Sequence, residues 1–246
     1  MKNILKIMLM MITIFTIAGS AVYAAEIPVS DQDQLITSSD WTEISNLQDE
    51  MKKEEPDATI DYDKALKVYV DCNLIKLQTA DTKKLTSALE SANYVWVIPF
   101  KMEKTYGIFT VAKGLPLREE AKSVLTKAEQ EEVKNHAGKW MITETAEHTV
   151  EPYYDILLEK REALSDCTRV VLVGSQPGMR QPVALGMDDE TARIWISLGY
   201  QYPVMKKIPE TQNVESGVYS FDSVAEISDT YIAVSYTHLR AHETSA

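Results

Sequence analysis

The residues from 94 to 114 constrain the possible fold more than any other stretch of this sequence. Two apolar runs, YVWVIPF at 94–100 and TYGIFTVAKG at 105–114, are separated by four residues of which three are charged. Both runs are rich in aromatic and β-branched residues, which predicts two strands joined in a hairpin. Residues on both faces of the first run are apolar, so we expect that strand to be buried on both sides.

Strands and helices are predicted in a similar order on both sides of this hairpin. Residues 57–114 have the pattern of a strand, a helix capped by Asp81 and then the hairpin, and residues 139–233 that of a strand, a helix and further strands. Residues 115–138 are expected to be a helical linker, with Thr126 and Glu129 spaced as a capping box. We therefore expect an α+β fold of two strand-helix-strand-strand units with antiparallel sheets, packed as one body or as two close lobes.

Ahead of the first unit, residues 25–56 form a polar segment. Trp41 begins a short run of near-helical apolar spacing, and Asp40 and Glu43 are placed as a capping box. We expect a short amphipathic helix lying on the body, and the alternative is a segment that frays in solution.

Residues 1–24 have the pattern of a secretory signal peptide. Lys2 and Lys6 give them a basic start, an apolar run covers 7–17, and small residues lead up to Ala24. An uncleaved membrane anchor is the alternative, but the run is shorter than the roughly 20 residues that span a bilayer. We expect cleavage after Ala24 and a mature chain that is secreted or held at the cell surface.

The end of the chain has a different signature. Residues 234–244, VSYTHLRAHET, resemble one reading frame of a transposase adapter used to prepare sequencing libraries. We expect 234–246 to be a non-native tail and the second unit to be truncated near Ala233, and a natural tail is the alternative. Just before it, Ser223 and Glu226 are spaced as a capping box, which predicts that a helix starts there.

The charge of the chain limits its partners. Residues 25–233 hold 22 Lys and Arg and 36 Asp and Glu, a net charge of −14. So acidic a surface repels phosphate backbones and anionic lipid head groups, and we do not expect nucleic acid as a partner. We also expect no membrane span in the mature chain, because the apolar run of 7–17 lies in the part to be cleaved. An extracellular protein or polymer of unknown identity is the partner we expect, although solubility alone is the better explanation of the charge.

Two cysteines remain after the signal peptide. Cys72 closes the strand predicted at 67–71, and Cys167 precedes the strand predicted at 169–173. If those strands run antiparallel side by side, both sulfurs lie at the same end of the sheet and a disulfide can form, as is common in exported proteins. Two buried free thiols fit the sequence equally well.

No residue can be assigned a catalytic role. His136 and His148 lack the H-E-x-x-H spacing of zinc hydrolases, and no cofactor motif is present, so we expect no cofactor. Asp57, Asp61 and Asp63 supply oxygen ligands for a hard cation such as calcium, although they lack the glycine and closing glutamate of an EF-hand. Carboxylates for glycoside hydrolysis cannot be chosen, because that chemistry depends on a separation in space.

The remaining candidate is an aromatic group near the end of the chain. Arg193 and Trp195 alternate with apolar residues on a strand with one wet face, and Tyr200 and Tyr202 follow it. Exposed residues of these types anchor protein and sugar contacts, whereas a covering helix would make them core. The sequence favours a secreted, non-enzymatic binding module for a protein, wall or glycan ligand, and the alternatives are an extracellular hydrolase or the scaffold of a longer wall-anchored protein.

Overall fold

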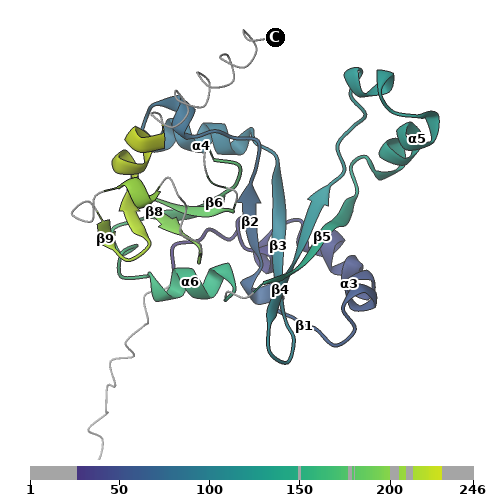
Figure 1. Ribbon diagram of the computed structural model, residues 1–246, viewed down its shortest axis with the longest axis horizontal. Helices are drawn as coiled ribbons and strands as arrows, with labels where there is room; N and C mark the ends of the chain where they lie inside the picture. Colours follow the sequence, from purple (N-terminus) through teal and green to yellow (C-terminus); the bar gives the residue numbers. More distant parts are fainter. Residues whose placement is uncertain are drawn as a thin grey trace, which may run out of the picture.

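The computed structural model describes residues 27–148, 151–176, 179, 181–199, 205–208 and 213–228. Their strands form one mixed sheet in the order β5-β4-β3-β2-β6-β7-β8-β10-β9, and β1 pairs with β3 beside this path (Figure 1). The chain is therefore of the mixed α+β class, as predicted. The strands are β1 (Thr59–Ile60), β2 (Leu66–Tyr69), β3 (Tyr94–Lys101), β4 (Tyr106–Lys113), β5 (Trp140–His148), β6 (Arg169–Val173), β7 (Val183–Met187), β8 (Ala192–Ser197), β9 (Asn213–Glu215) and β10 (Val218–Ser220).

Helices cover both faces of the sheet. On one face, α4 and the helix over residues 221–228 cover β6, β7 and β8, and α2 and α3 cover β3 and β4. On the other face, α6 packs across β2, β6 and β7. The helices and 3₁₀ turns are η1 (Leu35–Thr37), α2 (Trp41–Ile44), η2 (Ser45–Leu47), α3 (Gln48–Glu54), η3 (Tyr62–Lys64), η4 (Ile75–Leu77), α4 (Thr82–Glu90), η5 (Glu120–Ser123), α5 (Lys127–His136), α6 (Tyr153–Glu159) and η6 (Met205–Lys207).

None of the helices in the described part of the chain is long and apolar enough to cross a membrane.

The predicted hairpin is present as β3 and β4. Their pairing runs from Val95↔Ala112 to Lys101↔Tyr106. In β3, Trp96 packs under α2 and α3 and Val97 packs on the opposite face with α6, and both side chains are buried. The strand is thus buried on both sides, as its doubly apolar sequence predicts.

The division into two strand-helix-strand-strand units with antiparallel sheets is not confirmed. The strand after the predicted linker, β5, pairs with β4, because residues 114–139 leave the sheet and return beside the strand they left. After α6, β6 enters the same sheet beside β2 and runs parallel to it. The strands predicted for both units therefore build one continuous sheet.

Two of the predicted helix caps are confirmed. Thr126 and Glu129 form the capping box at the start of α5, and Gly138 follows the helix with a φ of +76°. At the start of α4, the Asp81 side chain accepts a hydrogen bond from the Lys84 amide. A short polar residue at the N-cap and a glycine in the left-handed region after the C-terminus are the preferred ends of a helix.

The other two capping boxes are wrong. Asp40 precedes α2, but its carboxylate accepts hydrogen bonds from Tyr94 and Trp96 rather than from the helix backbone. The last described helix starts at residue 221, earlier than predicted, and the Ser220 hydroxyl accepts from the Ser223 amide. In the first case the side chains of a distant strand take the hydrogen bonds of the carboxylate, and in the second the helix begins earlier, so that Ser220 is its cap.

The join between the two halves of the sheet is short. It consists of the parallel pair β2 and β6, which are in register only over the last residues of each strand, Val68↔Leu172 and Tyr69↔Val173. At their beginnings the two strands pair with a third piece of chain instead, the segment 28–35. We call this opening the fork and the segment 28–35 the wedge.

The wedge hydrogen-bonds to both strands of the fork. The Val170 amide of β6 donates to the Pro28 carbonyl at 2.7 Å, and the Lys67 amide of β2 donates to the Asp33 carbonyl at 3.0 Å. Backbone groups buried without partners are costly, so a fork left open would leave such groups of both strands unsatisfied. The wedge therefore completes the sheet where its two halves meet.

The Asp33 carboxylate fastens the wedge in place. Its side chain is 2% exposed, and it accepts hydrogen bonds from the Tyr69 hydroxyl at 2.7 Å, the Ser30 hydroxyl at 2.6 Å and Arg169 Nη2 at 3.1 Å. Lys67 Nζ lies 3.9 Å from the same group. A buried carboxylate is tolerated only when it is paired in this way, and here its partners come from both β2 and β6.

The second cation of this cluster lies among aromatic rings. Lys67 Nζ is 4.5 Å from the ring centre of Tyr94 and 5.2 Å from that of Trp96. Burial lowers the pKa of Lys67, while Asp33 and Asp40 act in the opposite direction. A cation over ring faces is attracted by their π electrons, so the rings hold the ammonium group where water is scarce.

Replacing Asp33 by Asn is expected to destabilise the protein. The amide keeps the shape of the side chain but removes the negative charge that faces Arg169 and Lys67, and the loss of one partner from a buried pair costs about 3 kcal/mol. The free energy of unfolding, measured by urea titration, should fall by about 3 kcal/mol. The exposed neighbour Asp31 provides the control, because Asp31→Asn should change the free energy of unfolding by less than about 0.5 kcal/mol. Equal small losses for both variants would contradict the role given to Asp33.

Candidate functional site

The predicted aromatic site is not assembled as expected. Trp195 is fully buried in the core, 6.0 Å from the Phe221 ring of the last described helix, whereas Arg193 is exposed and pairs with Asp188 at 2.5 Å. The interpretation of Trp195 as a surface residue is therefore wrong. Tyr200 and Tyr202 lie outside the described residues.

Trp195 is buried because the helix over residues 221–228 covers its face of β8, which is the covering-helix alternative, while Ile194 and Ile196 pack on the opposite face. A bulge explains why Arg193 does not share that face. The pairing between β7 and β8 shifts at Gly186 and Met187, so that Met187 pairs with Ala192 and Gly186 with Ile194. Arg193 is the extra residue, and it is left out of the ladder. Ala192 and Trp195 consequently share the face that the helix over residues 221–228 covers.

The three candidate metal ligands do not form a site. Among the residues that the structure describes, no group of three or more His, Cys, Asp or Glu side chains could hold a metal ion, so Asp57, Asp61 and Asp63 are not such a group. Asp61 instead pairs with Lys64 at 3.6 Å. Their clustering in sequence reflects the ends of the short strand β1 and of η3.

The geometric argument for a disulfide is also wrong. It assumed antiparallel strands, but β2 and β6 run parallel, so Cys72 follows the end of one strand and Cys167 precedes the beginning of the other. The two side chains belong to the cores on opposite faces of the sheet, and both are buried free thiols.

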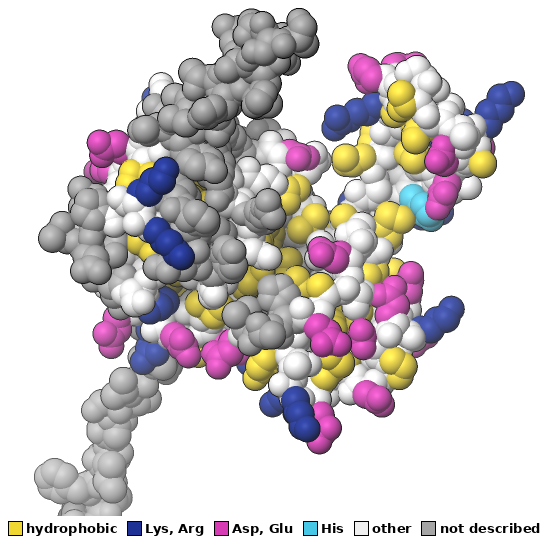
Figure 2. Space-filling view, viewed as in Figure 1, with side chains coloured by type: hydrophobic (Ala, Val, Ile, Leu, Met, Phe, Trp, Pro, Cys, Tyr) yellow, Lys and Arg dark blue, Asp and Glu magenta, His cyan; other side chains and the backbone are white. Residues whose placement is uncertain are grey.

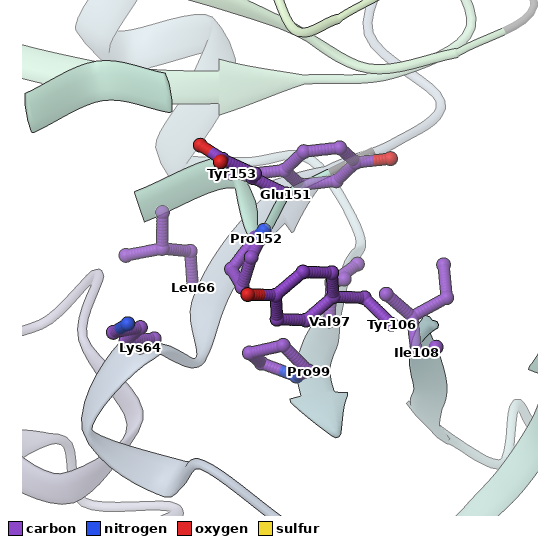
Figure 3. Close-up of a pocket in the computed structure, with 10 residues that line it drawn as sticks. Lys64, Leu66, Val97, Pro99, Tyr106, Ile108, Glu151, Pro152 and Tyr153 are labelled. Carbon is purple, nitrogen blue, oxygen red and sulfur yellow. The ribbon is translucent and has the colours of Figure 1, made fainter. Parts of the chain in front are cut away.

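A small pocket lies where α6 meets the hairpin (Figure 3). Tyr106, Pro99 and Pro152 line it, and its volume is about 10 Å³. At its rim the Lys64 ammonium donates to Asp155 at 2.8 Å, and this hydrogen bond raises the pKa of Lys64. A cavity of this size has room for about one water molecule, so it is not a ligand site.

The long connection between β4 and β5 is the most exposed feature of the described structure. Residues 114–139, which we call the arm, contain η5 and α5 and project away from the sheet (Figure 1). No residue of the arm is buried, and Val124 is 79% exposed. Helices as short as α5 are marginal in water without tertiary packing. The arm therefore depends on its own caps and turns, such as the hydrogen bonds from Gln130 Nε2 to the Lys122 and Leu125 carbonyls.

The base of the arm is closed by tight backbone contacts. The Gly114 amide donates to the Lys139 carbonyl at 2.9 Å, and the Gly138 amide donates to the Gly114 carbonyl at 2.8 Å. A Cβ atom at position 114 would lie 2.1 Å from the His136 carbonyl oxygen, so only glycine permits this crossing. The two legs of the arm are thus fixed to each other where they leave the sheet.

A groove of about 700 Å³ runs between the base of the arm and the body. Apolar side chains line most of it, among them Val95, Ala112 and Leu115, together with the rings of Tyr94 and Trp140. Figure 2 shows hydrophobic side chains gathered over the surface between the arm and the body. Clefts of 300–1,000 Å³ with mostly apolar walls are the usual form of binding sites.

Few charged groups border this groove. Asp71 lies on the body side and accepts a hydrogen bond from Asn93 at 3.1 Å, and Lys113 lies on the arm side with Nζ 5.4 Å from the centre of the Trp140 ring. The indole nitrogen of Trp140 is buried without a hydrogen-bond partner among the described residues. The groove thus presents an apolar surface with one acid and one base at its margins.

The sequence of residues 115–138 predicts a helical linker rather than a projecting arm. The available signal was the composition of 127–136, KAEQEEVKNH, which has no apolar stripe and therefore no face to pack on a sheet. A helix that is polar on all sides is typical of a segment that stands in solvent.

Comparisons with protein-family models, with curated proteins and with solved structures find no match to this chain.

The reactivity of Cys72 and Cys167 tests whether they are buried free thiols, as the structure has them. Burial raises the pKa of both Cys72 and Cys167 to about 11, so at pH 8 about one thiol in a thousand is ionised. The folded protein should therefore react slowly with a thiol reagent such as dithionitrobenzoate. In concentrated urea without reductant, two thiols per chain should react quickly, and a count of zero would show that the cysteines are bridged.

Proposed function

We propose that this chain is an exported, non-enzymatic interaction module that binds an extracellular protein or polymer through the arm and the groove at its base. One observation carries the proposal: a 26-residue arm without a buried side chain stands beside an apolar groove. Contiguous exposed apolar surface on an otherwise well-packed protein is typical of interaction sites.

The conformation of the arm supports a contact role. Its base is fixed by Gly114 and its helix is capped by Thr126, so the arm holds a defined shape although it packs on nothing. A preorganised element loses little conformational entropy when it binds. Its most exposed large apolar residue, Val124, and Leu115 at 46% exposure are the contacts that a partner would cover.

The chemistry of the groove favours binding over hydrolysis. Glycoside hydrolysis uses two carboxyl groups about 5–9.5 Å apart. Among the described residues that line the groove, Asp71 is the single carboxylate, and it is engaged by Asn93. Elsewhere, hydrogen bonds lower the pKa of Asp188 and Glu129, which is the opposite of what a general acid needs.

Export is part of the same proposal. It is supported by the apolar pattern of residues 1–24 and by the position of Ile27, which is buried in the core three residues after the expected cleavage site. On export from a host with a secretory pathway, the N-terminal sequence of the mature chain should begin at Ala25. A product that keeps residues 1–24 would contradict cleavage.

Charged substitutions on the arm test the binding proposal. The variant L115D/V124D should capture partner proteins or wall polymer from the host's extracellular fraction at least about tenfold less well, a loss of about 1.4 kcal/mol. The control is L77D, because Leu77 is 44% exposed, close to the 46% of Leu115, but lies in η4 away from the arm. Unchanged capture by the arm variant would overturn the proposal.

A further inference from the structure

We infer that the free edge of β5 is a docking site for an extended, basic segment of a partner protein, which adds to the sheet as one further strand. The residues involved, 144–148, do not line the groove, so the inference goes beyond the proposed function and does not rest on it. Two features of the same edge carry it: an open backbone and carboxylates without a cation.

The outer edge of β5 is open. β5 is the last strand in the order of the sheet, and it pairs with β4 alone. Within the described part of the chain, no other segment hydrogen-bonds to its backbone. At nine residues it is also the longest strand described. Alternate N–H and C=O groups of such an edge point away from the sheet, so the partner that satisfies them is an extended chain.

A bulge limits the length of edge that a partner can use. The pairing with β4 shifts at Thr110 and Val111, so Thr143 of β5 has no partner in register. Bulges break the ladder and protect an edge from unwanted pairing. Past this point the register with β4 is regular over residues 144–148. A docked strand therefore pairs with this part of β5.

Carboxylates stand on both faces of this part of the edge. Glu144 and Glu147 are three residues apart in a strand, so their side chains lie on opposite faces, and both are exposed. On α3, the exposed Glu54 carboxylate accepts a hydrogen bond from the Thr145 hydroxyl and so lies next to β5. Glu144 accepts one from the Thr110 hydroxyl at 3.4 Å. Among the described residues, none of these carboxylates forms an ion pair.

The carboxylates select the charge of the added strand. Side chains directly opposite each other on neighbouring strands have Cβ atoms about 5 Å apart, where opposite charges attract and like charges repel. A second copy docked through the same edge would bring carboxylates together. A strand with Lys or Arg at two positions three apart instead places one cation opposite Glu144 and one opposite Glu147. The small, half-buried Thr145 and Ala146 between them leave room for β-branched side chains.

The probe is a short peptide with this pattern, acetyl-TKVVKT-amide, added to the purified chain and followed by NMR. Its binding should shift the amide signals of residues 144–148 and slow hydrogen exchange at alternate positions among them, because those amides gain partners. The control peptide acetyl-TEVVET-amide has the opposite charge and should bind at least about tenfold more weakly. Equal binding of both peptides, or binding of neither, would overturn the inference.

Reversing the charge of the edge tests the same contact from the side of the protein. E144K/E147K should bind the lysine peptide at least about tenfold more weakly than the wild type and should prefer the glutamate peptide. The matched control is E131K/E132K, which makes the same change of charge at exposed positions of α5 and should keep the preference for the lysine peptide. An E144K/E147K variant that is folded by circular dichroism and still prefers the lysine peptide would contradict the inference.

Methylation of the peptide backbone separates strand addition from an ionic contact. Successive N–H groups of an extended strand point to opposite sides, so only one of the two valine N–H groups faces β5. Of two lysine peptides, each N-methylated at one valine, one should lose binding and the other should keep it. The same affinity for both would refute strand addition.

The edge before any peptide is added decides between occupants. In the free chain, alternate amides of residues 144–148 should exchange quickly. Slow exchange in a chain that sediments as a dimer would show that a second copy covers the edge, and slow exchange in a monomer would show that another part of the chain does. Either result would overturn the inference. L115D/V124D should bind the lysine peptide as the wild type does, so this inference and the proposed function can fail separately.

Discussion

The fork between β2 and β6 is the point on which this structure depends. Two strands that are far apart in the sequence meet in parallel over only their last residues, and the segment 28–35 fills the space where they separate. The backbone bonds of Val170 and Lys67 to this wedge satisfy polar groups that would otherwise face an opening in the sheet. Without the wedge, the sheet of β2 to β5 and the sheet of β6 to β10 would be joined only by the short pairing between β2 and β6.

The Asp33 side chain adds charged and hydrogen-bonded contacts to the backbone bonds between the wedge and the two strands. It gathers Arg169 from β6 and Tyr69 and Lys67 from β2 around one carboxylate. Such a cluster is expensive to desolvate, and removing one partner would leave a buried charge without compensation. It joins β2, β6 and the wedge at one point. The hairpin, and with it the arm and the groove, are positioned on one side of that join.

Sequence reasoning reached the parts of this fold that depend on local pattern. The hairpin, the caps of α4 and α5 and the mixed class follow from apolar alternation and cap spacing, which act over a few residues.

Prediction from the sequence failed where contacts between distant residues decide the outcome. Asp40 accepts hydrogen bonds from Tyr94 and Trp96 of β3 instead of capping a helix, and the helix over residues 221–228 covers the face of β8 that holds Trp195. Asp33 was one of 36 acids in residues 25–233, and nothing local marked it as buried. The groove could not be predicted, because its walls come from strands, a helix end and the base of the arm.

The most direct test of the wedge is the rate of amide hydrogen exchange at three backbone positions, measured by NMR on the native protein. The amides of Val170, Lys67 and Leu35 donate across the fork at 2.7, 3.0 and 3.1 Å. If the wedge completes the sheet, these amides should exchange as slowly as those in the centre of β3, because they open only with the global unfolding of the domain. Exchange as fast as in the exposed arm would show that the segment is not held in the fork, and would contradict this account of the fold.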